Sequence, residues 1–324
     1  MTLRTRLTEK LGIAHPILLA PMGGVAGGRL AAAVSEAGGL GLIGGGYGDA
    51  AWLDREFAAA GNRRVGCGFI TWSLAKNPAL LEHVLAHAPT AVMLSFGDPL
   101  PFAARIRAAG SVLICQVQNR DQALQALDAG AEIVVAQGTE AGGHGGARAT
   151  LPLVPALVDL VARRAPEAMV VAAGGIADGR GLAAALALGA EGVLVGTRFY
   201  ASVESLAHDL AKARVVAASG ETTLRTTIFD IARGLDWPKP YTGRALTNAF
   251  TSRWHGRETE LAAAQLDEMK RYKAAAEASD FATAVIFAGE AVDLIGDAPP
   301  AATIVARLAE EAERALRAAA RHLA

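Results

Sequence analysis

A histidine stands between two pairs of glycines in the segment Gln137–Gly146, at position 144. Imidazole titrates near neutral pH, so this side chain can remove a proton from a bound molecule and later return it. The neighbouring glycines offer little local packing that would hold the ring as a core residue, and they let the backbone approach a ligand closely. We therefore interpret His144 as a candidate general base in a ligand-binding loop.

Two further glycine-containing segments are typical of phosphate binding. The first is Ala172–Gly179, which contains Gly174 and Gly175, and the second begins with Gly196 and Thr197. Glycines let backbone N–H groups come close to phosphate oxygens, and the threonine hydroxyl adds a donor. Glycines in tight turns are the alternative for each segment taken singly. Both segments together, with no second phosphate motif in the chain, favour binding of a monophosphate.

These segments follow elements that repeat along the chain: a short apolar run, a glycine-containing turn and an Ala/Leu-rich helical stretch. The predicted strands are Ile17–Ala20, Leu40–Ile43, Val65–Ile70, Ala91–Ser95, Val112–Val117, Ile133–Gln137, Met169–Ala173 and Gly192–Val195. Apolar strands that alternate with helices are typical of parallel strands covered by helices. Eight of them favour an α/β fold of the (β/α)8 TIM-barrel type, in which active sites lie on the loops after the strands and phosphate commonly follows strands seven and eight.

The repeat stops after about residue 216. The stretch 216–285 contains Trp237 between an aspartate and a proline, Trp254, and a polar helical segment over Glu258–Ala278. We predict that residues 216–285 form a smaller, mainly helical cap over the barrel mouth. Residues 1–215 and 286–324 then form the barrel, the last part as an amphipathic helix over 301–323.

The order and spacing of the motifs resemble those of the FMN-dependent nitronate monooxygenases, once called 2-nitropropane dioxygenases. The resemblance covers nearly the whole chain and rests on Ala20–Gly24, Gly38–Gly41, Glu140–Gly145, Ala173–Gly179 and Val195–Phe199. It implies an enzyme that binds FMN and oxidises alkyl nitronates or nitroalkanes with O2 to carbonyl compounds and nitrite. The alternative is a flavin-dependent reductase that uses NADH or NADPH on a quinone or an enoyl-acyl-carrier-protein. A non-catalytic flavin-binding barrel is a third reading, against which the histidine in its glycine loop argues.

The resemblance also implies roles for individual residues. His144 falls on the position of the family's catalytic base, and the backbone around Met22 would lie by the flavin ring. The cofactor-binding residues implied in this way are Ala20, Pro21, Met22, Gly23, Gln116, Gln137, Gly142, Gly143, Ala173, Gly174, Gly175, Gly196 and Thr197. The chain departs from its relatives at Leu19, where glutamine is common, and at Gln116, where quinone-reductase relatives carry lysine.

Composition excludes several other classes. Lys and Arg number 31 against 32 Asp and Glu in 324 residues, so the net charge is −1 and no nucleic-acid partner is indicated. Hydrophobic residues make up 52% of the chain, yet no run is long and apolar enough for a membrane span. The N-terminal residues lack a secretory signal, and Cys67 and Cys115 lie in apolar runs. We expect a cytoplasmic monomer or homodimer that acts on a small-molecule substrate and O2.

Two other patterns are set aside. His83 and His87 are four residues apart and would share a helix face, as in zinc-binding helices. A glutamate beside the first histidine and a third ligand at the usual spacing are both missing, so we interpret the pair as a solvated face and predict no metal site. The segment Gly39–Gly44 fits a dinucleotide-binding spacing, but its centre is itself a predicted strand, which favours barrel packing.

Overall fold

The computed structural model describes residues 3–322 and contains a closed barrel of eight parallel strands. The barrel strands are β1 (Ile17–Leu19), β2 (Gly41–Gly46), β3 (Val65–Ile70), β4 (Ala91–Ser95), β5 (Val112–Val117), β6 (Ile133–Gln137), β8 (Met169–Ala173) and β9 (Val193–Val195). They are hydrogen-bonded in the order β1-β9-β8-β6-β5-β4-β3-β2, and a parallel bridge between Leu18 and Leu40 closes the ring. The predicted TIM barrel is confirmed.

The side chains of the strands alternate between two apolar cores. One core fills the interior of the barrel and includes Leu42, Met93, Ile114 and Val135; the other lies between the strands and the surrounding helices. Helix α1 (Arg6–Leu11) contributes Leu7 and Leu11 to the interior core. Because α1 also bonds to Glu191, just before β9, it closes the end of the barrel at which the strands begin. The opposite end, where the strands finish, we call the barrel mouth.

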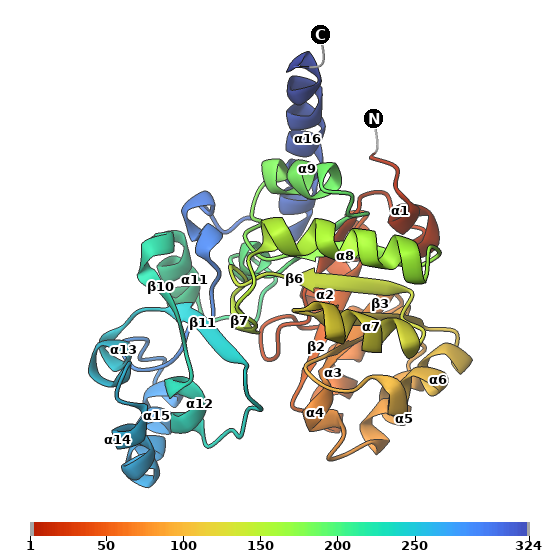
Figure 1. Ribbon diagram of the computed structural model, residues 1–324. Coiled ribbons are helices and arrows are strands. Elements are labelled where there is room, and N and C mark those ends of the chain that lie inside the picture. Colours follow the sequence, from red (N-terminus) through yellow and green to blue (C-terminus); the bar gives the residue numbers. More distant parts are fainter. Residues whose placement is uncertain (1–2, 323–324) are drawn as a thin grey trace.

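Helices cover the outside of the barrel (Figure 1). They are α2 (Gly28–Glu36), α3 (Ala50–Ala60), α4 (Thr71–Leu74), α5 (Ala79–Leu85), α6 (Leu100–Ala108), α7 (Arg120–Asp128), α8 (Thr150–Arg164), α9 (Gly179–Ala187) and α10 (Thr197–Tyr200). The eighth place is taken by α16 (Ala301–Ala319), which packs between α9 and α2 and continues into the short helix η3 (Ala320–His322). None of the helices among residues 3–322 has both the length and the apolar character needed to cross a membrane.

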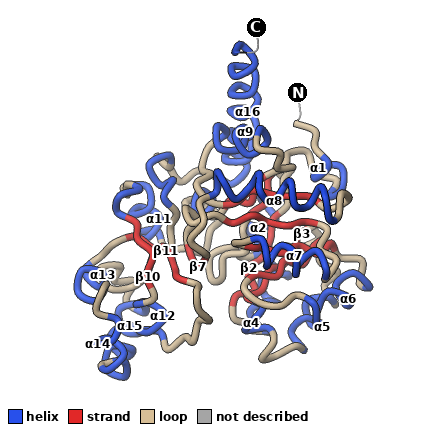
Figure 2. Tube along the Cα trace, in the orientation of Figure 1, coloured by secondary structure: helices blue, strands red, loops and turns tan. Residues whose placement is uncertain are grey.

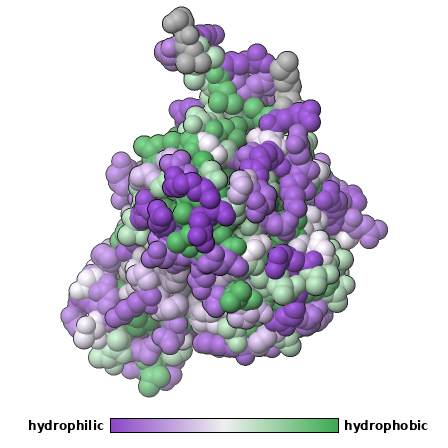
Figure 3. Space-filling model, turned by 45° about the vertical axis from the view of Figure 1, so that its right-hand side comes forward, coloured by the Kyte–Doolittle hydropathy of each residue, from purple (hydrophilic) through white to green (hydrophobic). Residues whose placement is uncertain are grey.

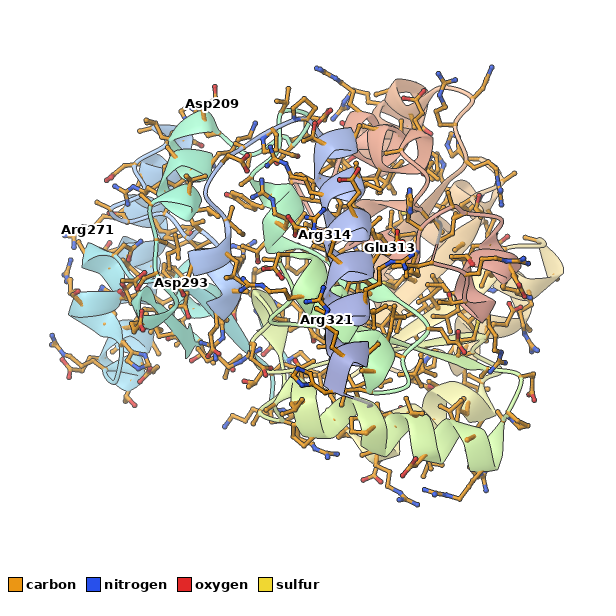
Figure 4. All side chains as sticks on the ribbon, turned by 90° about the horizontal axis from the view of Figure 1, so that it is seen from above. Asp209, Arg271, Asp293, Glu313, Arg314 and Arg321 are labelled. Carbon is orange, nitrogen blue, oxygen red and sulfur yellow. The ribbon has the colours of Figure 1, made fainter. Side chains whose placement is uncertain are left out.

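Helix α16 is amphipathic, as its sequence predicts. Its apolar face buries Ile304, Val305 and Leu308 against the barrel helices, while its far end projects beyond the barrel (Figure 1). Glu313 and Arg314 lie on this helix, and Arg321 lies on η3 at its end, in the view from above (Figure 4). On the face shown in Figure 3, hydrophilic and hydrophobic residues are interspersed.

The chain between β9 and α16 forms a second body beside the mouth. Its elements are α11 (Asp209–Val216), η1 (Gly220–Thr222), β10 (Thr223–Thr226), α12 (Ile228–Arg233), β11 (Thr242–Leu246), α13 (Ala249–Trp254), α14 (Glu258–Ala263), α15 (Gln265–Glu277) and η2 (Glu290–Leu294). The continuous helix expected over 258–278 is divided at Ala264 into α14 and α15. We call residues 216–285 the cap.

The cap is joined to the barrel by a small sheet that the sequence does not predict. Strand β7 (Gly143–Gly145) lies inside the glycine loop after β6 and pairs with β11, which in turn pairs with β10, all antiparallel. Figure 2 shows these three strands between the barrel and the cap helices. The cap is therefore anchored to the loop that carries the candidate base.

Candidate active site

His144 is the central residue of β7 and lies opposite Gly243 of β11. Its neighbour Gly143 has a φ of 74°, a conformation that residues with a Cβ atom rarely adopt, and the position that a Cβ would take there faces open space. The backbone carbonyl of His144 accepts a hydrogen bond of 3.0 Å from the Gln137 side chain at the end of β6. The histidine is thus fixed by strand pairing on one side and by the barrel on the other.

The side chain of His144 is packed, contrary to the expectation that its glycine neighbours leave it loose. The residue is 8% exposed, and its Nε2 atom lies 2.9 and 3.0 Å from the two carboxylate oxygens of Asp230 on α12. The Trp237 ring stacks on the imidazole with 3.4 Å between ring centroids, and Phe287 lies at 5.4 Å. The packing comes from the cap and from the segment after it, which local sequence does not reveal.

These surroundings determine the protonation of His144. Burial lowers the pKa of His144, Asp230 opposes this shift, and Arg233 and Arg225 add to it. At neutral pH the imidazole is therefore uncharged. Its one proton is on Nε2, which donates to Asp230, and Nδ1 is free to accept a second proton. Because the unfolded chain takes up this proton more readily, the contribution of His144 to stability is present above the ordinary pKa of 6.5 and is lost as the pH falls below it.

Aromatic residues enclose the Trp237 side of the histidine. Tyr47, Trp72 and Phe96 follow β2, β3 and β4 respectively, and their rings meet Trp237 edge-on at centroid distances of 6.4, 5.5 and 5.1 Å. Tyr241 of the cap joins them, and the Trp237 indole donates a hydrogen bond to the Tyr47 hydroxyl. This aromatic cluster, Tyr47, Trp72, Phe96, Trp237 and Tyr241, makes the Trp237 side of the imidazole apolar.

The structure brings most of the predicted glycine segments together at the mouth. A Cβ atom added to Gly174 would lie 3.0 Å from the Gly138 carbonyl oxygen, and one on Gly196 would lie 3.6 Å from the Met22 sulfur. The Thr197 hydroxyl accepts a hydrogen bond of 3.0 Å from the Gly289 amide.

The Gly289 backbone in turn lies against Gly142. The loops after β1, β6, β8 and β9 therefore converge. Ala20, Pro21, Gly23, Gly143, Ala173 and Gly175 lie on the same loops or at the strand ends before them.

Gln116 is a predicted cofactor-binding residue that lies on a strand and not on one of these four loops. It lies on β5 and lines a cavity of about 210 Å³ together with Phe96 and Tyr241 of the aromatic cluster. The glutamine that connects β5 to the histidine loop is instead Gln118, whose amide donates a hydrogen bond of 2.8 Å to Gln137.

Buried polar atoms without partners also gather at the mouth. Among residues 3–322 six such atoms occur; two are on His15 and Arg198, and the other four are on Thr71 and Trp72 after β3, Gln118 after β5 and Arg225 of β10. Buried polar groups are almost always hydrogen-bonded, so these atoms mark a place where a polar ligand would complete the site. Burial, followed by the neighbouring Arg244, lowers the pKa of Arg225 to about 10, which still leaves it charged at neutral pH. The site therefore suits an anionic ligand.

Sequence reasoning missed Asp230, Gln118 and Arg225. Asp230 lies 86 residues from His144, and no spacing rule links an aspartate in a cap helix to a histidine in a barrel loop. Trp237 carried a weak signal, because a tryptophan among prolines in a cap segment suggests a packed loop. The residues that contact His144 could not be identified from sequence, because they reach it only through the pairing of β7 with β11.

The fold and this site define a (β/α)8-barrel enzyme with a buried, unprotonated imidazole at a glycine-lined mouth. The family model described as nitronate monooxygenase matches residues 4–62 and 73–311. The chain is 35% identical to a nitronate monooxygenase of Neurospora crassa, over 94% of this chain and 90% of that protein. The chain belongs to the nitronate monooxygenase family, whose members are flavin-dependent oxidoreductases.

Solved structures agree with this assignment. FabK from Thermotoga maritima superimposes with a TM-score of 0.87 at 32% identity, covering 99% of this chain and 100% of that one. The nitroalkane oxidase of Streptomyces ansochromogenes superimposes with a TM-score of 0.79 at 30% identity, covering 97% and 99% of the two chains. Both matches extend over the cap as well as the barrel.

Replacing Asp230 with asparagine should lower the pKa of His144 further. The carboxylate stabilises the imidazolium form, whereas the asparagine amide keeps a hydrogen-bonding oxygen near Nε2 without the charge. An NMR titration of the His144 ring in the two proteins measures the difference. Asp293→Asn is the control, because Asp293 bonds to the Gly220 amide and should leave the titration unchanged. An unaltered His144 titration in Asp230→Asn would contradict this electrostatic role.

Proposed function

We propose that the chain is an FMN-dependent nitronate monooxygenase, which oxidises alkyl nitronates or nitroalkanes with O2 to carbonyl compounds and nitrite. The observation that carries the proposal is the buried, unprotonated imidazole of His144, held by Asp230 beside cationic side chains. Such a base suits the removal of a carbon-bound proton, and its cationic surroundings favour the anion that results.

The glycine segments support FMN as the cofactor. Gly174 and Gly175 have φ values of 103° and 72°, and both stand directly after β8, where barrel enzymes commonly bind phosphate. Backbone amides of these residues and of Gly196-Thr197 would hold the single phosphate, and the polar atoms of Gln118 and Arg225 would face the polar parts of the flavin. When bound, the flavin supplies the electron-accepting chemistry of the reaction.

His144 would act on the substrate through its free nitrogen. Because Nε2–H is engaged by Asp230, Nδ1 is the atom that accepts the α-proton of a neutral nitroalkane. Asp230 then stabilises the imidazolium that forms, and it is a positioning residue in this scheme. Arg225 and Arg233 raise the positive potential in which the nitronate anion is held.

The cap, residues 216–285, would complete the site. It contributes Asp230, Trp237 and Arg225, and the aromatic cluster would exclude water from the base. Cys67 and Cys115 are free and buried, which is compatible with the cytoplasmic location that we propose.

The second candidate is a nicotinamide-dependent flavin reductase, the alternative that the resemblance of the motifs also implies. We expect anaerobic reduction of the bound flavin to be fast with propyl nitronate and slow with NADH or NADPH. The reason is that the chain lacks a credible dinucleotide motif. Stopped-flow absorbance of the flavin band measures all three reactions. Fast reduction by NADH or NADPH, with no response to the nitronate, would show that the protein is a nicotinamide-dependent reductase.

The purified protein should carry FMN and not FAD, as identified by mass spectrometry of the cofactor released by heat. Gly175→Val should lower the retained FMN, because branched side-chain atoms would intrude where backbone meets phosphate. Gly110→Val is a matched control: its φ of 77° imposes the same kind of backbone strain as the 72° of Gly175, but it lies in the turn before β5. Equal flavin retention in the two variants would mean that the phosphate binds elsewhere.

His144→Gln should slow turnover of neutral nitroalkanes by about 10²–10⁴-fold, the usual contribution of a positioned acid–base group. The glutamine amide can still reach Asp230, so that the buried carboxylate keeps a partner and FMN content is preserved. Pre-formed nitronates have already lost the proton and should be affected much less. Steady-state rates with both substrate forms give the comparison. An equal loss for both forms would leave His144 with a binding or packing role only.

A further inference from the structure

A second group of side chains, which could bind a metal ion, lies on the helices outside the barrel, away from His144. His83 on α5 and His87, two residues beyond its end, direct their Nε2 atoms at one carboxylate oxygen of Asp54 on α3. The two distances are 2.8 and 2.9 Å, and the three ligand atoms all lie within 4.8 Å of one another. The third ligand, absent from the neighbouring sequence, thus comes from another helix.

We propose that Asp54, His83 and His87 form a zinc site that fastens α3 to α5. Two imidazole nitrogens and one carboxylate oxygen are a donor set that Zn²⁺ commonly takes in proteins, with water as the fourth ligand. Around tetrahedral Zn²⁺ with bonds of about 2.0–2.1 Å, neighbouring ligand atoms stand about 3.3 Å apart. The two distances from Asp54 to the imidazole nitrogens need to change only by a few tenths of an ångström to match, and the two nitrogens, which lie within 4.8 Å of each other, would settle at about the same separation.

The site is preorganised on one side and open on the other. The His87 ring lies parallel to the Phe57 ring of α3, with centroids 4.4 Å apart, which fixes the plane of the imidazole. Phe57 is itself buried in the core between strands and helices. The side chains of His83 and Asp54 are 35% and 51% exposed, so a metal ion can enter from solvent.

The chemistry of the site points to a structural role. In zinc proteases with two histidines at this spacing, a glutamate beside the first histidine acts as the base. The corresponding position is Val84 in this chain, and it is buried. A metal held here would therefore join two barrel helices and would lack the glutamate base of the zinc proteases.

The test uses the full-length holoenzyme without a polyhistidine tag, freed of metal with a chelator and titrated with Zn²⁺ against a chromophoric competitor. We expect one Zn²⁺ per chain and a rise in Tm on adding Zn²⁺ that Mg²⁺ does not produce. His83→Asn and Asp54→Asn should each weaken Zn²⁺ binding at least about tenfold and abolish the rise in Tm.

The matched control is His255→Asn. His255 is another half-exposed histidine near a carboxylate, 3.8 Å from Glu258, but among residues 3–322 it belongs to no group of three potential metal ligands. This variant should bind Zn²⁺ as the unmodified protein does. X-ray absorption of the zinc-loaded protein should show two imidazoles in the metal shell. Absence of stoichiometric binding, or binding that survives both His83→Asn and Asp54→Asn, would overturn the proposal and leave the three residues as a hydrogen-bonded group.

Discussion

The hydrogen bond between His144 and Asp230 joins the barrel to the cap at the centre of the site. The histidine belongs to a barrel loop and the aspartate to a cap helix, and both side chains are almost fully buried. A buried carboxylate requires a partner, so the bond holds only if the cap is docked on the mouth. The pairing of β7 with β11 provides that docking, and Trp237 then covers the ring. The hydrogen bond, the burial that lowers the pKa of His144 and the aromatic cover over its ring therefore all depend on the docking of the cap.

The glycines of the mouth impose a second constraint, which concerns backbone and not side chains. Gly44 and Gly68 illustrate it: a Cβ on the first would lie 2.3 Å from the Met22 carbonyl oxygen, and one on the second would lie 2.3 Å from the Pro21 ring. The segment after β1 can therefore cross the mouth only because its neighbours carry no side chain. The same absence of side chains leaves backbone amides after β8 and β9 accessible. Glycine thus serves two purposes at the mouth: it lets the loops pack closely, and it leaves the backbone accessible to a ligand.

Most of the barrel could be predicted from sequence because its strands are continuous apolar runs separated by clear turns. Val65–Ile70, Ala91–Ser95 and Met169–Ala173 appear with the expected bounds. The short strands β7, β10 and β11 could not be predicted, since they are three to five residues long and owe their pairing to tertiary contact. For the same reason, sequence does not predict the contact of Asp230 with His144 or that of Asp54 with His83. The residues of each pair are far apart in the chain, and only the fold makes them neighbours.

Helix α16 occupies the eighth position of the barrel wall, although the whole cap precedes it in the chain. The wall between α9 and α2 is therefore completed by residues that leave the ribosome only after the whole cap. Until then, the apolar sides of α2 and α9 that α16 covers stay open to water, and the growing chain carries a finished cap on an unfinished barrel. Such an order makes the nascent protein a substrate for chaperones until α16 emerges.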